Sequence, residues 1–196
     1  MSMTVVSTDL DVALDSLEHA VAQLQTAELD HLSASEELAV VRRLEVLRRR
    51  LDAGTDRAAG HLDRSAAFSL DGHKSAKGAL KAIGRLPGAE AHGRVQTSRA
   101  LRDLPLVAAA YERGEIPTAH VRAIARVVSN PRVAEHVPGA DAIFAHHAPV
   151  LGFDDFIVVL RRWEALADAD GAERSADECH ERRRAALVES AINSSW

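Results

Sequence analysis

Seven basic side chains in the middle of the chain have the types and the spacing that suit contacts with phosphate groups. They are Lys74, Lys77, Lys81, Arg85, Arg94, Arg99 and Arg102. The first four recur every three or four residues, so on a helix they fall within a sector of about 60°. Lysine and arginine neutralise DNA phosphates, with about one counterion released for each contact. The spacing therefore predicts a surface that binds the backbone of double-stranded DNA.

The distribution of charge along the chain favours the same interpretation. Residues 72–132 hold eleven Lys and Arg against four Asp and Glu, a net charge of +7, whereas 1–71 and 133–196 each carry −6. The whole chain has a net charge of −5. A field arranged in this way is typical of proteins with an anionic partner. A second interpretation stays open, in which the stripe is the solvated face of an amphipathic helix that the acidic flanks balance.

The basic residues lie on two expected helices with the outline of a helix-turn-helix. A helix over 75–85 precedes a break at 86–88, and a second helix covers 89–103. In this motif the second helix enters the major groove, where side chains such as Gln96, Thr97 and Ser98 can reach base edges. Expected to face a core are Ala76, Ala79, Leu80, Ile83, Val95 and Leu101. Tyr111 is the one aromatic residue in 72–132, which argues against single-strand binding by base stacking.

Two longer helices are expected before this segment. One covers about 9–28, and the other opens at Ser33, where Glu36 completes the spacing of a capping box. Their apolar stripes are formed by Leu14, Leu17, Val21 and Leu24 on the first, and by Leu38, Val41, Leu44, Leu47 and Leu51 on the second. These stripes predict an antiparallel hairpin. They could equally pair with a second copy of the chain, which would make a homodimer through residues 9–64.

The remaining patterns are also helical. Pro105 and Pro117 open helices that reach about Arg113 and Val128, and Gly114 ends the first of these. Short helices are expected within 131–149, followed by helices over 153–167 and 172–191, and no segment alternates with the period of a strand. We therefore predict an all-α multi-helix bundle. Its parts are an N-terminal hairpin (1–71), a basic helix-turn-helix-like core (72–132) and C-terminal helices (133–196), which form one continuous domain.

Residues that could perform catalysis or bind a metal form no convincing set. His146, His147, Asp154 and Asp155 have the residue types of a metal-dependent nuclease, but their segment is expected to be helical. Cys179 and His180 are adjacent, so on a helix they point about 100° apart and do not face each other. We expect His120 to be packed rather than catalytic, and the run at 182–184 to be solvated. The sequence predicts no catalytic residue, metal or cofactor.

The composition and the hydropathy of the sequence indicate the cellular compartment that we expect. Cys179 is the single cysteine, so no intramolecular disulfide can form and a reducing cytoplasm is the simplest expectation. No apolar run approaches the roughly 20 residues that cross a bilayer. The N-terminus lacks the basic and then apolar layout of a signal peptide. We therefore expect a cytoplasmic protein without a membrane partner.

Two strings within the chain carry a resemblance to a known family. They are SRALRDLP at 98–105 and GEIPTAHVRAIA at 114–125, with Asp71-Gly72 before them and Asp170-Gly171 after them. The chain resembles the actinobacterial 13E12 repeat family, whose shared region is domain of unknown function 222 (DUF222). Members commonly continue into an HNH endonuclease domain, so the resemblance implies a role connected with DNA. The HNH motif is absent from this sequence, and we expect a stand-alone or truncated copy.

These observations lead to two hypotheses of different kinds. The first is a non-catalytic DNA-binding helical module, related to the N-terminal region of HNH endonuclease proteins. The second is a helical module for protein–protein interaction or dimerisation, or a non-functional copy, without a nucleic-acid role.

Overall fold

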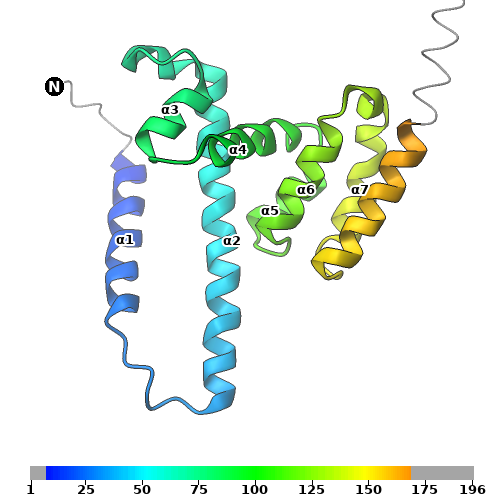
Figure 1. Cartoon of the computed structure of the whole chain (residues 1–196). Coiled ribbons are helices and arrows are strands. Elements are labelled where there is room, and N and C mark those ends of the chain that lie inside the picture. Colours follow the sequence, from blue (N-terminus) through cyan, green and yellow to red (C-terminus); the bar gives the residue numbers. More distant parts are fainter. Residues whose placement is uncertain (1–7, 169–196) are drawn as a thin grey trace, which may run out of the picture. The chain divides into compact units, whose positions relative to one another are not determined.

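The computed structural model describes residues 8–168, and these residues are helical with no strand, which confirms the all-α prediction (Figure 1). The chain divides into two compact units, Met1–Leu44 and Glu45–Trp196. The boundaries predicted at 71 and 132 stay predictions. The helix expected over 172–191, Cys179, His180 and the run at 182–184 lie outside the described residues.

The first unit contains α1 (Thr8–Gln25) and the first turns of α2 (Ala34–Ser65). The predicted capping box forms at the start of α2, where Glu36 Oε2 accepts hydrogen bonds from Ser33 N at 2.8 Å and from Ser33 Oγ at 2.6 Å. These bonds lower the pKa of Glu36. The apolar residues of α1 predicted to form a stripe are all exposed. The first unit therefore contains a capped start of α2, and the apolar stripe of α1 is exposed to solvent.

The second unit builds the core from short helices. After the end of α2 the chain forms η1 (Ala67–Asp71), α3 (Ala76–Ile83), α4 (Gly88–Ala100), α5 (Pro105–Glu112), α6 (Thr118–Val128), η2 (Pro131–His136), α7 (Val137–His147) and a helix over 153–168. Pairs α3–α4, α4–α6 and α5–α7 pack together. The largest fully buried side chains include Leu104, Tyr111, Ile124, Phe144 and Phe156. No helix in the described part is both long and apolar enough to cross a membrane.

Helix ends in the core follow the predicted proline and glycine signals. Pro105 lies in the first turn of α5, and Gly114 follows that helix with φ +78°, the left-handed conformation that glycine adopts without strain. Pro117 is the N-cap of α6 rather than its first residue. The buried Asp141 of α7 accepts hydrogen bonds from Leu106 N at 2.8 Å and Val107 N at 3.0 Å. This side chain satisfies free N–H groups at the start of α5, a cap that comes from a distant helix.

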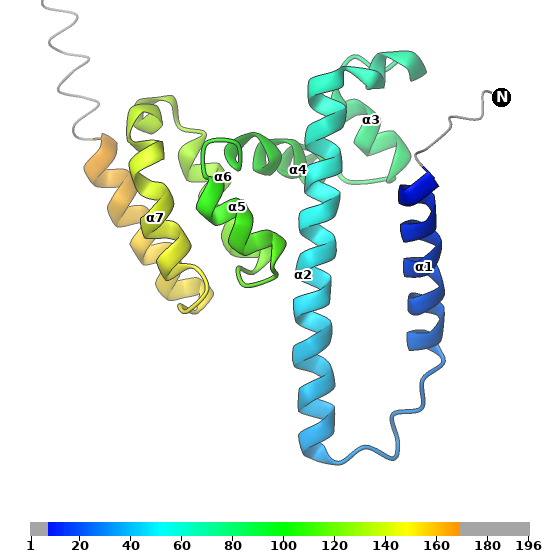
Figure 2. The same ribbon diagram turned by 180° about the vertical axis from the view of Figure 1, so that it is seen from behind.

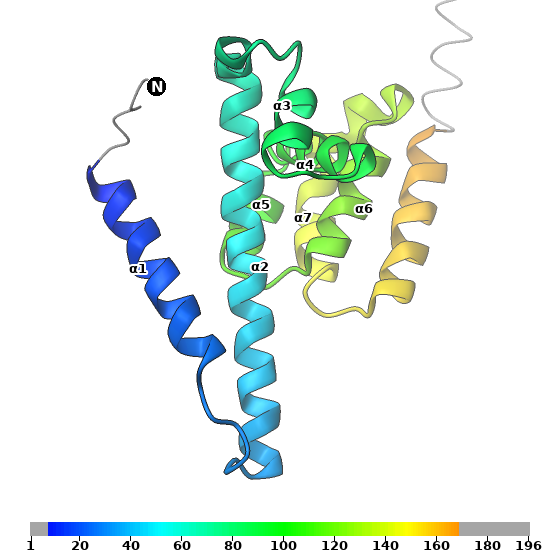
Figure 3. The same cartoon turned by 60° about the vertical axis from the view of Figure 1, so that its left-hand side comes forward.

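The second half of α2 is held on the core largely by polar contacts and by glycine. Figures 2 and 3 show α4 crossing this part of α2. At the crossing a Cβ on Gly60 would lie 2.8 Å from Ser98 Cβ, so the absence of a side chain permits the close approach. A Cβ on Gly114 would lie 2.8 Å from the carbonyl oxygen of Val46. Gly60 thus allows close contact between α2 and α4, and Gly114 allows close contact between α2 and the α5–α6 loop.

Candidate nucleic-acid interface

Helix α3 presents the predicted basic stripe to solvent. Ser75 caps the helix, and its Oγ accepts a hydrogen bond from Gly78 N at 3.1 Å. Ala76 and Ala79 are buried on the inner side. The four basic residues at 74, 77, 81 and 85 are all exposed. The amphipathic pattern therefore places Lys77 and Lys81 on the outer face of α3, while Lys74 precedes its N-cap and Arg85 follows its C-cap.

Ion pairs divide the eleven basic residues of 72–132 into two groups. Within residues 8–168, six of them pair with a carboxylate: Arg94, Arg99, Arg102, Arg113, Arg122 and Arg132. The five for which the described residues provide no carboxylate partner are Lys74, Lys77, Lys81, Arg85 and Arg126. Four of these five belong to the stripe on α3. The uncompensated positive charge of this segment is thus concentrated on α3 and the residues that flank its two ends.

The three other predicted DNA contacts are engaged within the protein. Arg99 makes a two-pronged pair with Asp63 of α2, with both N–O distances 2.8 Å, and Arg102 Nη2 lies 3.4 Å from the same carboxylate. The hydrogen bond from Arg99 is the main reason that the pKa of Asp63 is lowered. Arg94 is half-buried and pairs with Glu90 at 3.2 Å. Arg99 and Arg102 therefore join the end of α4 to α2, and Arg94 is paired within α4, whereas the residues of the stripe have no such partner among residues 8–168.

Glu90 connects α4 with α6. It accepts hydrogen bonds from Arg122 at 2.6 Å and 2.9 Å in addition to the bond from Arg94. Burial acts to raise the pKa of Glu90, but the bonds from the two arginines outweigh it and the pKa is lowered. Because Glu90 is ionised and occupied by these two partners, it does not neutralise the α3 lysines.

Arg85 occupies a backbone position that normally belongs to glycine. Its φ is +50°, directly after the C-cap residue Gly84. Arg85 N donates to Ala82 O at 3.4 Å and Leu86 N donates to Lys81 O at 3.2 Å. This pair of bonds is the Schellman motif, whose left-handed residue is usually glycine because an L side chain costs about 1–2 kcal/mol there. A charged side chain at a strained position is an observation that points to function.

Two of the three α4 side chains expected to reach base edges are buried, whereas the third, Gln96, is half-buried. Thr97 is 1% exposed and Ser98 is 7% exposed, and Ser98 Oγ donates to Val95 O at 2.8 Å. In this conformation neither side chain can reach a DNA base. The predicted core residues Val95 and Leu101 do pack inward, but Ile83 at the end of α3 is 69% exposed rather than buried. Helix α4 is a central packing helix because α2 and α6 cover two of its faces.

A buried polar network lies beside this region and was not predicted. Tyr111 is fully buried and its hydroxyl donates to Asp56 Oδ2 at 3.1 Å, while Thr118 Oγ1 donates to Asp52 Oδ2 at 2.6 Å. Burial raises the pKa of Asp56 to about 6, and the hydrogen bond from Tyr111 only partly opposes this. The sequence signal for this network was that Asp52 and Asp56 are four residues apart and so lie on the same face of α2. The sequence did not indicate that Tyr111 of α5 and Thr118 of α6 would be their partners.

Of the histidines considered for catalysis, His120 is explained by packing. His120 is buried, its Nε2–H donates to Leu151 O at 3.1 Å, and its ring contacts those of Phe153 and Phe156. Burial lowers its pKa, so the ring is neutral. This confirms that His120 is a packed residue. His146 and His147 occupy the last turn of α7, where their rings lie 4.9 Å apart.

The described residues do not bring metal-binding side chains together. In the part of the chain from 8 to 168, no three His, Cys, Asp or Glu side chains form a group that could hold a metal ion. Asp154 and Asp155 are exposed in the first turn of the helix over 153–168, where carboxylates interact favourably with the helix dipole.

The fold and this surface define an all-α protein with a compact helical core and a short, uncompensated basic helix. The chain matches the domain of unknown function DUF222 over residues 38–191. It therefore belongs to the DUF222 family, as its sequence resemblance indicated. No curated protein and no solved structure matches the chain.

Proposed function

We propose that the protein is a non-catalytic, cytoplasmic module that binds double-stranded DNA through the backbone phosphates. The observation that carries this proposal is the stripe of Lys74, Lys77, Lys81 and Arg85, which is exposed and has no carboxylate partner among residues 8–168. Like charges gathered on one exposed surface create a positive field that attracts anions. A DNA backbone supplies anions at regular spacing, and four exposed cations on α3 and at its two ends match that chemistry.

The stripe suits contacts that position the protein on DNA rather than contacts that read its sequence. The side chains of Thr97 and Ser98, which could have read base edges, are buried. Phosphate contacts carry no direct sequence information. We therefore expect similar affinity for duplexes of unrelated sequence, and a strong dependence on salt.

Charge reversal of two lysines tests the proposal. In fluorescence anisotropy with a labelled duplex of about 25 base pairs, the variant Lys77→Glu/Lys81→Glu should bind at least about thirtyfold more weakly at 0.1 M salt. Its slope of log K against log salt should be shallower by about 1.8, since two phosphate contacts are lost. The matched control Arg161→Glu/Arg162→Glu reverses two exposed charges on the helix over 153–168 and should have a smaller effect. Equal affinity of the lysine variant and the native protein would show that α3 is not the binding surface.

A second candidate function rests on a different surface. Leu10, Leu14, Leu17, Val21 and Leu24 of α1 are 40–53% exposed, which is unusual for a repeating apolar stripe. We infer as the alternative that this stripe mediates protein–protein interaction, with a second copy of the chain as the simplest partner.

Self-association is measured by sedimentation equilibrium. The alternative predicts that the native chain forms a dimer and that Leu14→Glu/Leu17→Glu converts it to a monomer. The control Gln23→Glu adds a charge at an exposed polar position of the same helix and should leave the dimer intact. A native protein that remains monomeric at high concentration, whatever the salt, would contradict this alternative.

A further inference from the structure

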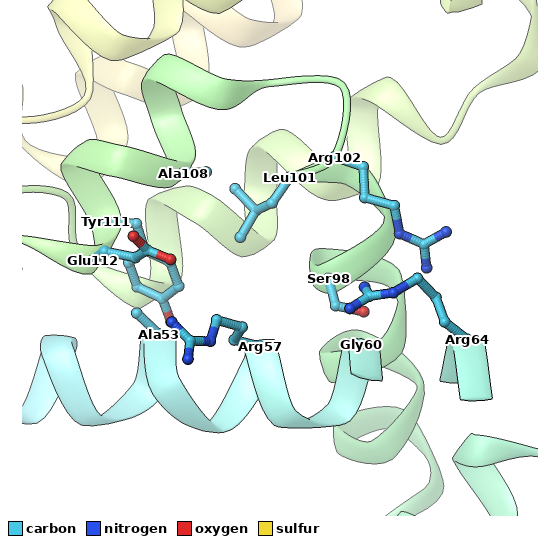
Figure 4. Close-up of a pocket in the computed structure, with 10 residues that line it drawn as sticks. All are labelled: Ala53, Arg57, Gly60, Arg64, Ser98, Leu101, Arg102, Ala108, Tyr111 and Glu112. Atoms are coloured by element: carbon cyan, nitrogen blue, oxygen red, sulfur yellow. The ribbon is translucent and has the colours of Figure 1, made fainter. Parts of the chain in front are cut away.

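A pocket with three arginines lies between the second half of α2, the end of α4 and α5. Its volume is about 170 Å³, and Leu101, Ala108 and the ring of Tyr111 form much of its apolar wall (Figure 4). Arg57 and Arg64 come from α2, and Arg102 follows α4. Glu112 is the one carboxylate in the lining. This excess of guanidinium groups is separate from the stripe on α3.

The charges are unevenly divided between the two ends of the pocket. Figure 4 shows the side chain of Arg57 near Glu112 and Tyr111, at the end where a carboxylate is present. At the other end the side chains of Arg64 and Arg102 lie beside Ser98 and Gly60. Among the described residues no carboxylate lines that end, so Arg64 and Arg102 face the pocket without a counterion inside it, although Arg102 contacts Asp63 outside the pocket at 3.4 Å.

The nearest carboxylate is already occupied. Asp63 makes its two short bonds, both 2.8 Å, with Arg99. Arg102 reaches Asp63 only at 3.4 Å, and no described carboxylate pairs with Arg64. Arg99 and Arg102 thus share one acid while Arg64 pairs with no described carboxylate, and a second oxyanion would complete the hydrogen bonding of Arg64 and Arg102. Guanidinium forks bind phosphate in a two-pronged geometry that matches this need.

The side chain of Arg64 lies close to Gly60 at this end of the pocket. A Cβ on Gly60 would lie 3.5 Å from Arg64 Nη1, which shows that the guanidinium folds back over the glycine. The hydroxyl group of Ser98 already donates its hydrogen bond to Val95 O, so the donors available to a ligand are those of the arginines. We propose that the Arg64–Arg102 end of the pocket is a binding site for a phosphate group. The group is either a phosphate of the DNA backbone or a free phosphorylated ligand.

The size of the pocket agrees with this assignment. Pockets for drug-sized ligands are usually about 300–1,000 Å³, so a site of this size suits a small group such as phosphate rather than a complete cofactor. This site rests on residues outside the proposed DNA stripe. It can therefore be present whether or not α3 binds DNA.

Inorganic phosphate is the probe for the test. In NMR spectra of the full chain that resolve arginine Nε–Hε groups, phosphate at constant ionic strength should shift the Arg64 and Arg102 signals in a saturable way. The variant Arg64→Gln should weaken phosphate binding, followed at Arg102, by about tenfold or more, because a charge-assisted bond is lost. The matched control Arg57→Gln removes a guanidinium from the opposite end of the pocket. It should change the affinity for phosphate by less than about twofold, because Arg57 does not contact a phosphate bound at the Arg64–Arg102 end. If phosphate causes no saturable shift, or if both variants lose phosphate affinity equally, the proposed phosphate site is wrong.

Two further measurements separate this site from the stripe and identify the source of the phosphate. The variant Lys77→Glu/Lys81→Glu should retain phosphate binding at Arg102 even where it loses DNA binding, so the two proposals can fail independently. Displacement of phosphate by a duplex would assign the site to the DNA backbone. Phosphate that remains bound in the presence of a bound duplex would assign it to a free phosphorylated ligand.

Discussion

The replacement Arg85→Gly should stabilise the protein and weaken its binding to DNA at the same time. Arg85 has φ +50° and closes a Schellman motif at the end of α3. Glycine would keep both backbone bonds of the motif and remove the Cβ that makes this conformation costly. The side chain that is removed is one of the four exposed cations of the stripe. The same substitution therefore acts on folding and on function with opposite signs.

The magnitude of each effect follows from the geometry. Relief of the left-handed conformation contributes about 1–2 kcal/mol. Glycine also increases the freedom of the unfolded chain, which costs about 0.4–1 kcal/mol. The free energy of unfolding should thus rise by about 0.5–1 kcal/mol. Loss of one phosphate contact should weaken DNA binding by roughly eightfold at 0.1 M salt and reduce the slope against log salt by about 0.9.

Urea denaturation followed by circular dichroism measures the first effect, and fluorescence anisotropy measures the second. Arg85→Ala is the matched control, because it removes the charge and keeps a Cβ at positive φ. It should bind DNA as weakly as Arg85→Gly without gaining stability. If Arg85→Gly is no more stable than Arg85→Ala, the backbone at this position is not strained. If both variants bind DNA like the native protein, Arg85 makes no phosphate contact.

Two more predictions concern the attachment of α2 to the core. Burial raises the pKa of Asp56 to about 6 from an ordinary 3.8, so ionisation penalises the folded state increasingly as the pH rises through this window. Asp56→Asn should therefore increase the free energy of unfolding by up to about 3 kcal/mol at pH 8 and have little effect near pH 4, as measured by urea denaturation at both pH values. A loss of stability at pH 8 would mean that the ionised carboxylate is favoured. Gly114→Ala should destabilise by about 2–4 kcal/mol, because it adds a Cβ at φ +78° and 2.8 Å from a carbonyl oxygen of α2. The control Gly54→Ala, in open space within α2, should instead gain up to about 1 kcal/mol in thermal or urea unfolding, and a similar loss in both variants would contradict this reasoning.

The helices of the core could be predicted because their ends are encoded locally. Ser75 and the Ser33–Glu36 pair cap helices with their own side chains, and Gly114 ends α5 through its backbone. These signals act within four residues, so the sequence contains all of their parts. The cap on α5 from Asp141 could not be predicted, because its donor and acceptor are 34 and 35 residues apart.

The candidate site was predicted only in part for a related reason. Helical periodicity places Lys77 and Lys81 on one face of α3, and this face is exposed because the opposite alanines are buried. Periodicity does not reveal which carboxylate reaches which arginine across the fold. Arg99 lies 36 residues from its partner Asp63, and the pair forms only when α4 packs on α2. Tertiary contacts therefore decide which cations stay free.

The division of the basic residues into paired and unpaired groups changes the expected dependence of DNA affinity on salt concentration. Seven phosphate contacts would give a slope of log K against log salt near −6.3, whereas the four residues of the α3 stripe give about −3.6. A phosphate held by Arg64 and Arg102 would add one contact and bring the slope to about −4.5. If Arg94 and Arg99 contribute to a slope near −6, they have to leave Glu90 and Asp63 when DNA binds. Since Asp63 joins α2 to α4, such a contribution would also mean that DNA binding loosens the attachment of α2 to the core.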